Sequence, residues 1–445
     1  MKINVKILIV FFLLIFLAFS IALYAKSSQS NMKQKEINLG TYIEGIGNMI
    51  SHESFIQALK DAEDKGISEI IIPFNSVILI SKTVTIPSEI SISANRGKVY
   101  VQLSKDFTGG NCFFIKGSNV HISDLIIDCS LIDRDSFHAF KIDPDGQLIQ
   151  NISIKNCEVF KNIKKNDYAV WIKGDEKEVL VKDVEISNCT FHNYYYGIRT
   201  TDNAENIKIS NSVFYSIANM AIDFQGSGEK KSYTRSIIIS NNFMSDIGGT
   251  GFAGHPIRLS TGGGIRHKNI LISNNTLIGN SLPFQDGGNA DMIGAYDCSI
   301  GVIESNYVAY GGDVGICLWR SDGLLVSKNS VENNNGKGIA VFSSQRCTIE
   351  TNFIMNNNIY SHLTNINKFE TGEISVAQYK PDEPLSTNNT ITDNQIVTTL
   401  KNDKIIRYNI LIKDNSPSNK ISRNVLENIN DSMIKVDDKS TILDQ

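Results

Sequence analysis

A short pattern of apolar and polar positions recurs along the chain and predicts stacked β-strands. Residues 303–308, 326–331 and 349–354 each follow the order apolar-x-x-Asn-x-apolar, with the asparagine at positions 306, 329 and 352. Alternation over so few residues is typical of a strand rather than a helix. Because the unit recurs with a fixed internal order, it predicts a solenoid whose coils each supply two or three short strands.

The asparagine position extends in both directions and predicts a ladder along the solenoid axis. Each side-chain amide can donate to, and accept from, the same amide one coil away. The position is occupied upstream by Asn275, Asn242, Ser212, Cys189, Cys157 and Leu125, and downstream by Asn394 and Asn424. Over residues 40–440 this pattern resembles the right-handed parallel β-helix of the pectate-lyase-like superfamily. The resemblance implies an all-β solenoid, on a fold that carries lyases, hydrolases, epimerases, binding proteins and phage tailspikes.

The first residues predict export from the cytoplasm. Lys2 and Lys6 precede an uncharged apolar run over residues 7–25, which fits either a cleaved signal peptide or an uncleaved membrane anchor. Both alternatives place the solenoid in the cell envelope, outside the cytoplasm, and the anchor would make the membrane a partner. The expected organisation is the export segment 1–25, a linker 26–39, and a β-helix domain 40–445 with regular coils over 115–355 and looser coils over 356–445.

Two further segments interrupt the strand pattern. Residues 51–62 form an amphipathic helix pattern, and its apolar side chains Phe55, Ile56 and Leu59 are expected to cover the first coil. Residues 360–388 contain Pro381 and Pro384 and are expected to form an excursion loop.

Charge and cysteine content exclude two classes. The net charge is −4 and the sequence shows no basic stripe, so a nucleic-acid partner is not expected. The seven cysteines are an odd number, and several lie inside strand patterns, which argues against a disulfide framework. Cys157 and Cys189 occupy the ladder position on successive coils, within bridging distance, but two buried free thiols are the favoured prediction.

The second strand of each repeat predicts an outward face with two columns of side chains. In a strand, the residue after an inward aliphatic points outward. The first column contains Lys141, Trp171, Arg199, Asp223, Arg258, Gly294, Cys317 and Ala340, and the second contains Asp143, Lys173, Thr201, Gln225, Ser260, Tyr296, Trp319 and Phe342. Aromatic rings beside a charged centre suit an acidic polysaccharide, since rings stack on sugars and arginines grip carboxylates. The alternative is a stabilising ion ladder on an exposed sheet.

The predicted catalytic residues lie at the charged centre of this face. They are Asp223, Arg258, Arg199, His255 and Asp291, and the predicted substrate-binding residues are Trp171, Lys141, Lys173, Gln225, Tyr296, Trp319, Arg320 and Phe342. His255 is expected on the rim, where a solvated loop histidine is the alternative. Asp291 lies two rungs from Asp223, roughly 10 Å by strand spacing, which is wide for an inverting glycosidase and too far for a retaining one. An arginine pair could instead serve β-elimination, one abstracting a proton and the other neutralising a uronate carboxylate.

Family signatures occur only in part. The resemblance to polygalacturonase-like hydrolases rests on Thr201-Asp202, Asp223 and Gly254-His255 in that order, without the paired aspartate and the Arg-x-Lys of that family. The Asp143-Pro144-Asp145 segment lacks the histidine of the mannuronan epimerase motif Asp-Pro-His-Asp. That segment could bind Ca²⁺, although a plain Pro-Asp-Gly turn is the favoured interpretation. No cofactor is required.

Together these observations predict an exported carbohydrate-active enzyme, a lyase or glycoside hydrolase, acting on an acidic polysaccharide along one sheet face. The alternative is a non-catalytic β-helix that binds glycan or helps assemble the envelope or its polysaccharide.

Overall fold

The computed structural model describes residues 36–42, 48–248, 254–279, 291–359, 369–400, 405–413, 416–429, 433–437 and 441–444. The predicted export segment 1–25 lies outside the described residues, as does most of the predicted linker. Within the described ranges, no helix has the length and apolar content needed to cross a bilayer.

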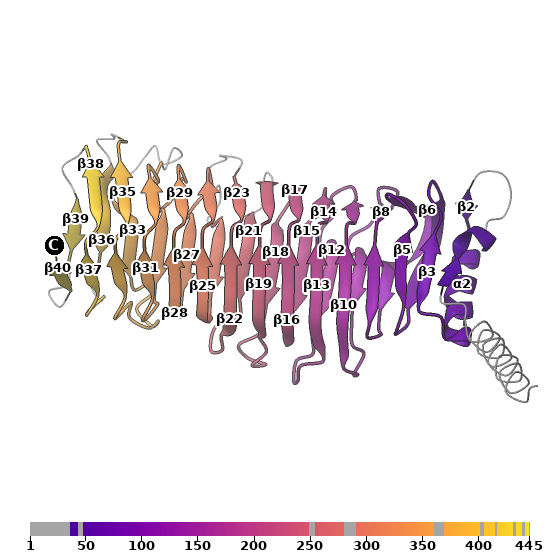
Figure 1. Ribbon diagram of the computed structural model, residues 1–445. Coiled ribbons are helices and arrows are strands. Elements are labelled where there is room, and N and C mark those ends of the chain that lie inside the picture. The colour runs from indigo at the N-terminus through magenta and orange to yellow at the C-terminus, as the bar shows by residue number, and fades with distance from the viewer. Residues whose placement is uncertain are drawn as a thin grey trace, which may run out of the picture.

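The chain coils into a parallel β-helix, which confirms the predicted all-β solenoid. Figure 1 shows the coils side by side along one axis, with the helix α2 (His52–Lys65) at the N-terminal end. In the part of the chain that the structure describes, the strands form one 15-stranded sheet and one 25-stranded sheet. Every pairing between these strands is parallel, because each strand bonds to its equivalent on the next coil.

The 15-stranded sheet receives one strand from each coil. Its strands are β1 (Glu36–Asn38), β3 (Glu69–Ile72), β5 (Ser91–Ala94), β7 (Val120–Ser123), β10 (Ile149–Lys155), β13 (Val181–Ser187), β16 (Ala204–Ser210), β19 (Thr234–Ser240), β22 (His267–Ser273), β25 (Cys298–Glu304), β28 (Asp322–Ser327), β31 (Thr348–Glu350), β34 (Thr390–Thr392), β37 (Lys420–Ser422) and β40 (Ile442–Asp444).

The 25-stranded sheet is folded into two rows. The β8–β38 row contains β8 (Leu125–Asp128), β11 (Glu158–Phe160), β14 (Thr190–His192), β17 (Val213–Ile217), β20 (Phe243–Ile247), β23 (Thr276–Ile278), β26 (Tyr307–Ala309), β29 (Ser330–Glu332), β32 (Phe353–Met355), β35 (Gln395–Thr398) and β38 (Val425–Asn428). The β9–β39 row contains β9 (His138–Ile142), β12 (Tyr168–Lys173), β15 (Tyr196–Thr201), β18 (Met220–Gln225), β21 (His255–Ser260), β24 (Ile293–Tyr296), β27 (Ile316–Trp319), β30 (Ile339–Phe342), β33 (Phe369–Ala377), β36 (Ile405–Ile412) and β39 (Ile434–Val436). The strand β6 (Val99–Ile115) pairs with both β8 and β9 and so joins the rows, and β2 (Met49–Ile50) and β4 (Val77–Ile86) precede it.

The predicted asparagine ladder is present. The side-chain Oδ1 of Asn329 accepts from the backbone N–H of Asn306 at 3.0 Å and from its Nδ2 at 2.9 Å. Asn329 Nδ2 donates to the Oδ1 of Asn352 at 3.0 Å, and Asn394 and Asn424 repeat the same pair of bonds downstream. Each rung therefore satisfies buried backbone groups that the turn would otherwise leave without partners.

Aliphatic side chains from the three strand rows fill the interior along the whole stack. All seven cysteines are buried free thiols, which confirms the favoured prediction for Cys157 and Cys189. The Cys189 thiol donates to the Ile154 carbonyl at 3.5 Å and to the Ser187 carbonyl at 3.3 Å.

The helix α2 covers the N-terminal end of the core as predicted. The Ser51 side chain caps it by accepting from the Ser54 N–H at 3.1 Å, and Gly66 ends it with a φ of 62°. Phe55 and Leu59 are buried. The expectation for Ile56 was wrong: it is 36% exposed, because Ala58 and Ala62 complete the buried face instead.

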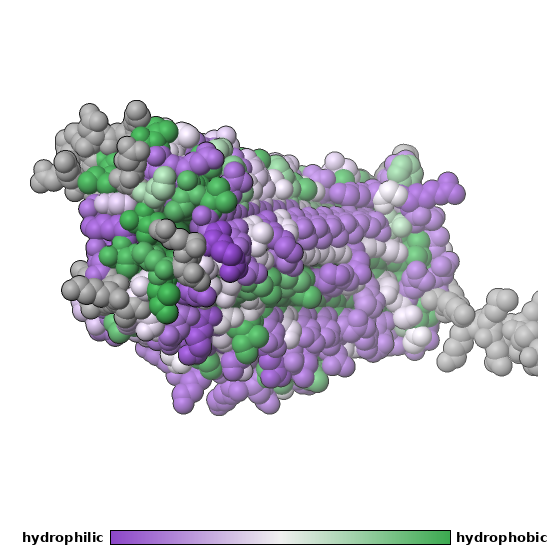
Figure 2. Space-filling model, turned by 60° about the vertical axis from the view of Figure 1, so that its left-hand side comes forward, coloured by the Kyte–Doolittle hydropathy of each residue, from purple (hydrophilic) through white to green (hydrophobic). Residues whose placement is uncertain are grey.

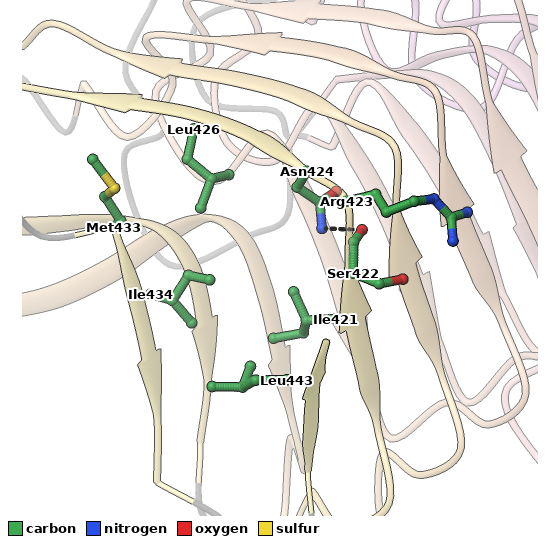
Figure 3. Close-up of a pocket in the computed structure, with 8 residues that line it drawn as sticks. All are labelled: Ile421, Ser422, Arg423, Asn424, Leu426, Met433, Ile434 and Leu443. Atoms are coloured by element: carbon green, nitrogen blue, oxygen red, sulfur yellow. Dashed lines mark hydrogen bonds between the residues drawn. The ribbon is translucent and has the colours of Figure 1, made fainter. Parts of the chain in front are cut away.

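Apolar side chains are exposed at the C-terminal end of the described coils. In Figure 2, where this end is turned forward, hydrophobic residues gather on it, and Val425, Ile442 and Leu443 are among the exposed side chains. Figure 3 shows Ile421, Leu426, Ile434 and Leu443 around a hollow. The volume of this hollow is about 320 Å³. Arg423 is the ionisable residue that borders it, and its guanidinium pairs with Asp393. The hollow therefore lies among apolar core side chains of the last described strands.

The predicted excursion loop was wrong over part of its length. Residues Phe369–Ala377 form β33, which pairs with β30 and β36. Glu373 is charged yet buried, so it breaks the apolar alternation by which a strand is recognised in the sequence. In the structure its carboxylate takes the place of an asparagine amide and accepts a hydrogen bond from Asn357 Nδ2 at 2.8 Å. The excursion that remains in the described residues runs over 378–388.

Candidate functional site

The candidate site lies on the outer face of the β9–β39 row. The strand register pairs Lys141 with Trp171, Trp171 with Arg199, Arg199 with Asp223 and Asp223 with Arg258. This register confirms the predicted alignment of the first outward column. The second column aligns in the same way, since Lys173, Thr201, Gln225 and Ser260 occupy successive rungs.

Asp223 lies beneath two arginines at the centre of the face. Arg258 donates from Nε to Asp223 Oδ1 at 2.9 Å and from Nη2 to Oδ2 at 3.2 Å. Arg199 Nε lies 3.3 Å from the same Oδ2. The Asp223 side chain is 0% exposed, whereas those of Arg258 and Arg199 are 22% and 14% exposed. The face therefore presents guanidinium groups, with their counter-charge below the surface.

The Asp223 carboxylate keeps the guanidinium of Arg258 in its protonated, positively charged form. Burial works to lower the pKa of Arg258, but the neighbouring carboxylate offsets this and leaves that pKa above its ordinary value. A guanidinium held in this state cannot act as a proton acceptor at neutral pH. It can hold an anion by charge-assisted hydrogen bonds.

Two tyrosines orient Arg199, and sequence analysis did not select them. The Arg199 guanidinium carbon lies 4.7 Å from the Tyr196 ring centroid and 5.4 Å from that of Tyr168, and its Nη1 donates to the Tyr168 hydroxyl at 3.3 Å. Both tyrosines stand two residues before an inward aliphatic, on successive rungs. The recurrence of tyrosine at this position on successive coils is the sequence signal by which the two residues could have been found.

Asp291 and Tyr296 form a buried pair beside Arg258. The Tyr296 hydroxyl donates to Asp291 Oδ2, and the Val314 N–H donates to Oδ1 at 3.3 Å. The Tyr296 ring reaches Asp291 by lying across Gly294, where an added Cβ would stand 2.6 Å from Cζ. Burial and the charge of Asp313 raise the pKa of Asp291 to about 7. Burial, followed by the charge of Asp291, raises the pKa of Tyr296 well above its usual range.

His255 begins strand β21 instead of lying in a rim loop, and its side chain is buried. Nδ1 lies 3.0 Å from the carbonyl oxygen of Asp291. Because a carbonyl only accepts, Nδ1 carries the hydrogen and Nε2 carries the lone pair. Burial and the charge of Arg258 lower the pKa of His255 to about 3, so the ring is neutral at neutral pH. Among the described residues, the hydrogen bond of the His255 ring is the one made by Nδ1.

Lysines and Trp171 form the N-terminal side of the face. The Asp143 carboxylate binds Lys141 at 2.9 Å and Lys173 at 3.1 Å, and Lys141 Nζ also lies 4.9 Å from the Trp171 ring centroid. The Trp171 Nε1 donates to Thr201 Oγ1 at 3.2 Å. The carboxylate of Asp145 likewise pairs with a lysine, at 2.6 Å. The predicted Asp-Pro-Asp segment thus presents carboxylates that already hold ammonium groups, and no cluster of three or more His, Cys, Asp or Glu suited to a metal occurs in the described ranges.

The C-terminal side of the face is packed rather than open. Tyr296, Val314, Cys317 and Ala340 form a buried cluster, against which Trp319 and Phe342 pack. Arg320 donates to Asp297 from Nε at 2.7 Å and from Nη2 at 3.0 Å. The predicted ring platforms Tyr296, Trp319 and Phe342 therefore contact one another through the cluster, and Tyr296 is only 4% exposed.

A pocket of about 350 Å³ adjoins Arg258. It is lined by Gln225, Arg258 and Ser260, and by residues 226–229 and 261–262 of two glycine-containing turns. Asp297 Oδ2 holds the second turn by accepting the Gly263 N–H at 3.1 Å. Sequence analysis missed Asp297, because nothing in its local pattern distinguishes it from a turn aspartate.

Comparisons with known proteins agree with this fold. A family model described as "Right handed beta helix region" matches residues 237–444. The A-module of mannuronan C-5 epimerase AlgE4 from Azotobacter vinelandii is similar in structure, with a TM-score of 0.57 and 12% identity, over 91% of this chain and 99% of that one. No match to a curated protein sequence was found.

Two further solved structures are similar. The periplasmic alginate epimerase AlgG has a TM-score of 0.53 and 12% identity, over 88% of this chain and 83% of that one. DFA-IIIase from Arthrobacter chlorophenolicus A6, solved in complex with GF2, has a TM-score of 0.53 and 12% identity, over 87% of this chain and 94% of that one. The chain is a right-handed parallel β-helix, and at this identity the likeness concerns the fold.

Proposed function

We propose that this protein acts on an acidic polysaccharide along the β9–β39 row, as a lyase that abstracts a proton next to a uronate carboxylate. The observation that carries the proposal is the layering of charge. Arg199, Arg258 and Lys141 reach the surface, whereas Asp223 and Asp291 lie below it.

An anionic polymer suits this arrangement better than a neutral one. Lys141, Arg199 and Arg258 each lie two rungs from the next, about 10 Å by strand spacing, so they form an extended line rather than a single point. Trp171 adds an aromatic surface within that line. Two proteins of similar fold are named as epimerases of mannuronan and of alginate, which supports a polysaccharide as the class of substrate.

His255 and Arg258 supply the two groups that the reaction requires. We assign the carboxylate of the sugar to Arg258, which neutralises it and acidifies the adjacent C–H. His255 Nε2 accepts that proton, the C–H electron pair forms the new C=C bond, and the C–O bond to the neighbouring sugar breaks. The departing oxygen takes a proton from water. Asp223 positions the two arginines and does not touch the substrate.

A glycoside hydrolase is less well supported. It needs one carboxylic acid and one carboxylate in contact with the glycosidic bond. Asp223 is held by two guanidinium groups, and Asp291 is held by the Tyr296 hydroxyl and the Val314 N–H. Neither carboxyl group is free to reach a substrate in this arrangement.

A non-catalytic glycan-binding role is the second candidate. It is favoured by the packing of the ionisable groups, since Arg199 and Arg258 already share Asp223 as a counter-charge, as they would in a stabilising ion ladder. On this alternative, Trp171 and the lysines carry the affinity and His255 carries none.

Turnover by the full chain tests the proposal. Uronate, sulfated and neutral polysaccharides are incubated with the protein while reducing ends and the ultraviolet absorbance of new double bonds are followed together. Both signals are expected to rise on a uronate polymer, and Arg258→Ala and His255→Gln are expected to abolish the rise. Arg235→Ala is the matched control, because it removes an arginine that pairs with Glu205 across coils of the other sheet.

The alternatives give different results in the same experiment. Reducing ends without absorbance would favour a hydrolase. A change in sugar configuration without cleavage, seen by NMR, would favour an epimerase. Binding without any chemical change, lost in Trp171→Ala and kept in His255→Gln, would favour the glycan-binding role.

The proposed location is outside the cytoplasm. A uronate polymer of the cell surface is met there, and one similar structure is named as periplasmic. Fractionation of cells that express the full chain, with detection of the protein in envelope and medium, tests this location and any membrane attachment.

A further inference from the structure

A loop closes the C-terminal end of the candidate binding face. Residues 378–384 leave strand β33 and turn back over the row at β27 and β30. The loop lies in the excursion that the two prolines predicted, and the proposed chemistry does not use it.

Glu383 attaches this loop to the face. Its Oε2 accepts from Trp319 Nε1 at 2.8 Å and from Ser343 Oγ at 2.8 Å, and its Oε1 lies 3.5 Å from Arg320 Nη1. The Glu383 side chain is only 10% exposed. A carboxylate of the protein therefore already occupies the donors that the aromatic end of the face would offer an acidic sugar.

Tyr379 covers the rings beneath the loop. Its ring centroid lies 5.0 Å from that of Trp319 at an interplanar angle of 60°, and 5.6 Å from that of Phe342. The loop also holds its own shape, because Gln378 Nε2 donates to the carbonyl of Glu383 at 2.7 Å and to that of Pro381 at 3.2 Å. Tyr379 is itself 49% exposed, so its ring forms the outer surface of a wall that rests on Trp319 and Phe342.

The wall makes the face asymmetric about Arg258. On the C-terminal side, Trp319 is two rungs away, roughly 10 Å by strand spacing. On the N-terminal side, the row continues for four rungs to Lys141, roughly 19 Å, past Arg199 and Trp171. A polymer on the face therefore has a longer run of rungs on the N-terminal side of Arg258, and it meets the loop on the C-terminal side.

We infer that the 378–384 loop ends the binding groove, so that the enzyme takes an acidic polysaccharide by its terminus and shortens it from that end. This inference rests on the proposed function. Glu383 and Tyr379 are the residues that set the specificity for a chain end. Glu383 also repels an acidic sugar that would advance beyond Arg258, since like charges at close range disfavour the complex.

The pattern of cleavage tests the inference. The full chain is incubated with alginate and polygalacturonate, and the loss of viscosity is plotted against the number of bonds cleaved. End-on cleavage is expected to release products of one small size while viscosity stays nearly constant. The double variant Tyr379→Ala/Glu383→Ala is expected to lower viscosity far more per bond cleaved and to release products of mixed size, because the groove then continues past β27.

Asp382→Ala is the matched control. Asp382 is an exposed acid in the same loop, so its loss changes the loop's charge while leaving the attachment through Glu383 in place. This variant is expected to keep the end-on pattern. Circular dichroism melting of all variants shows whether the coils remain folded.

The possible results distinguish failure of this inference from failure of the proposed lyase function. An early fall in viscosity with the unmodified protein would overturn end-on cleavage and leave the lyase standing. An unchanged product pattern in the folded double variant would also overturn it. Absence of both turnover and binding on every acidic polymer would overturn the proposed function, and the inference with it.

Discussion

Removal of the charge on Asp223 tests whether this residue organises the face. The variant Asp223→Asn keeps the shape of the side chain but leaves Arg199 and Arg258 adjacent without a counter-charge. Breaking a buried ion pair costs about 3–5 kcal/mol, because the remaining partner stays desolvated. Both guanidinium groups retain some exposure, 14% and 22%, so we scale the expected loss of unfolding free energy to about 2–3 kcal/mol.

Denaturation in urea followed by tryptophan fluorescence measures this loss. The chain has two tryptophans, Trp171 and Trp319, and both lie on the same row as Asp223. The matched control is Asp393→Asn, which removes a carboxylate that binds Arg423 through contacts of 2.8 and 2.6 Å, shorter than those of Asp223 with Arg258, on the exposed surface. We expect no measurable change in that control, since exposed pairs are already screened by water.

The same variant has an expected effect on turnover. Without its two bonds to Asp223, Arg258 is no longer fixed where the substrate carboxylate must bind, and a displacement of this kind costs about 100-fold in rate. If Asp223→Asn unfolds at the same urea concentration as Asp393→Asn and turns over substrate normally, Asp223 neither stabilises nor positions the arginines, and the account of the site is wrong.

Three other substitutions test separate parts of the structure. Gly294→Ala places a Cβ 2.8 Å from the Tyr296 hydroxyl and should break its bond to Asp291, lowering the melting temperature, whereas Gly110→Ala, with nothing within 4 Å of the added carbon, should leave it unchanged. Burial raises the pKa of Glu373 to about 7, so the contribution of this residue to stability should fall as pH rises from about 4 to about 7 and then level off. Glu373→Gln should remove this contribution, of order 3 kcal/mol, and leave the slope that Asp291 causes over the same pH range; an equally steep slope in the variant would contradict the assignment. Asn329→Ala leaves buried backbone groups on two coils without hydrogen-bond partners, and the free energy of unfolding should fall by about 3 kcal/mol. Thermal unfolding within error of the unmodified protein would show that the ladder is dispensable.

The repeated coils could be predicted from the sequence because their signal is local and periodic. Asn306, Asn329 and Asn352 recur with the aliphatics on either side, and this alone indicates the strand register. Once that register is known, the outward neighbours follow from the alternation of side chains. This is why Arg199, Asp223 and Arg258 could be predicted to lie on successive rungs.

The burial of side chains in the outward columns, and the residues that cover them, could not be predicted in the same way. Cys317 and Ala340 belong to an outward column, yet they are buried, because Tyr296 bends across Gly294 and Trp319 packs over them. Such packing depends on side-chain conformations on several coils at once.

Loops that return from distant sequence were also beyond prediction. Glu383 contacts Trp319 across 64 residues, and no repeat links the two positions. The strand that contains Glu373 was missed for a related reason. A charged residue is not expected at a buried strand position, and the amide of Asn357 that accommodates it lies on another coil.

The asparagine ladder has a consequence for how such a protein changes over evolutionary time. Each ladder residue bonds only to the coils next to it, so duplication or deletion of one whole 23-residue coil, such as that between Asn306 and Asn329, leaves the remaining rungs intact. Duplication of a coil between Arg258 and Trp319 would move the loop wall about 4.8 Å further from the arginine. The length of polymer accommodated can therefore diverge between lineages by copying coils, without any substitution among the residues that surround Arg258.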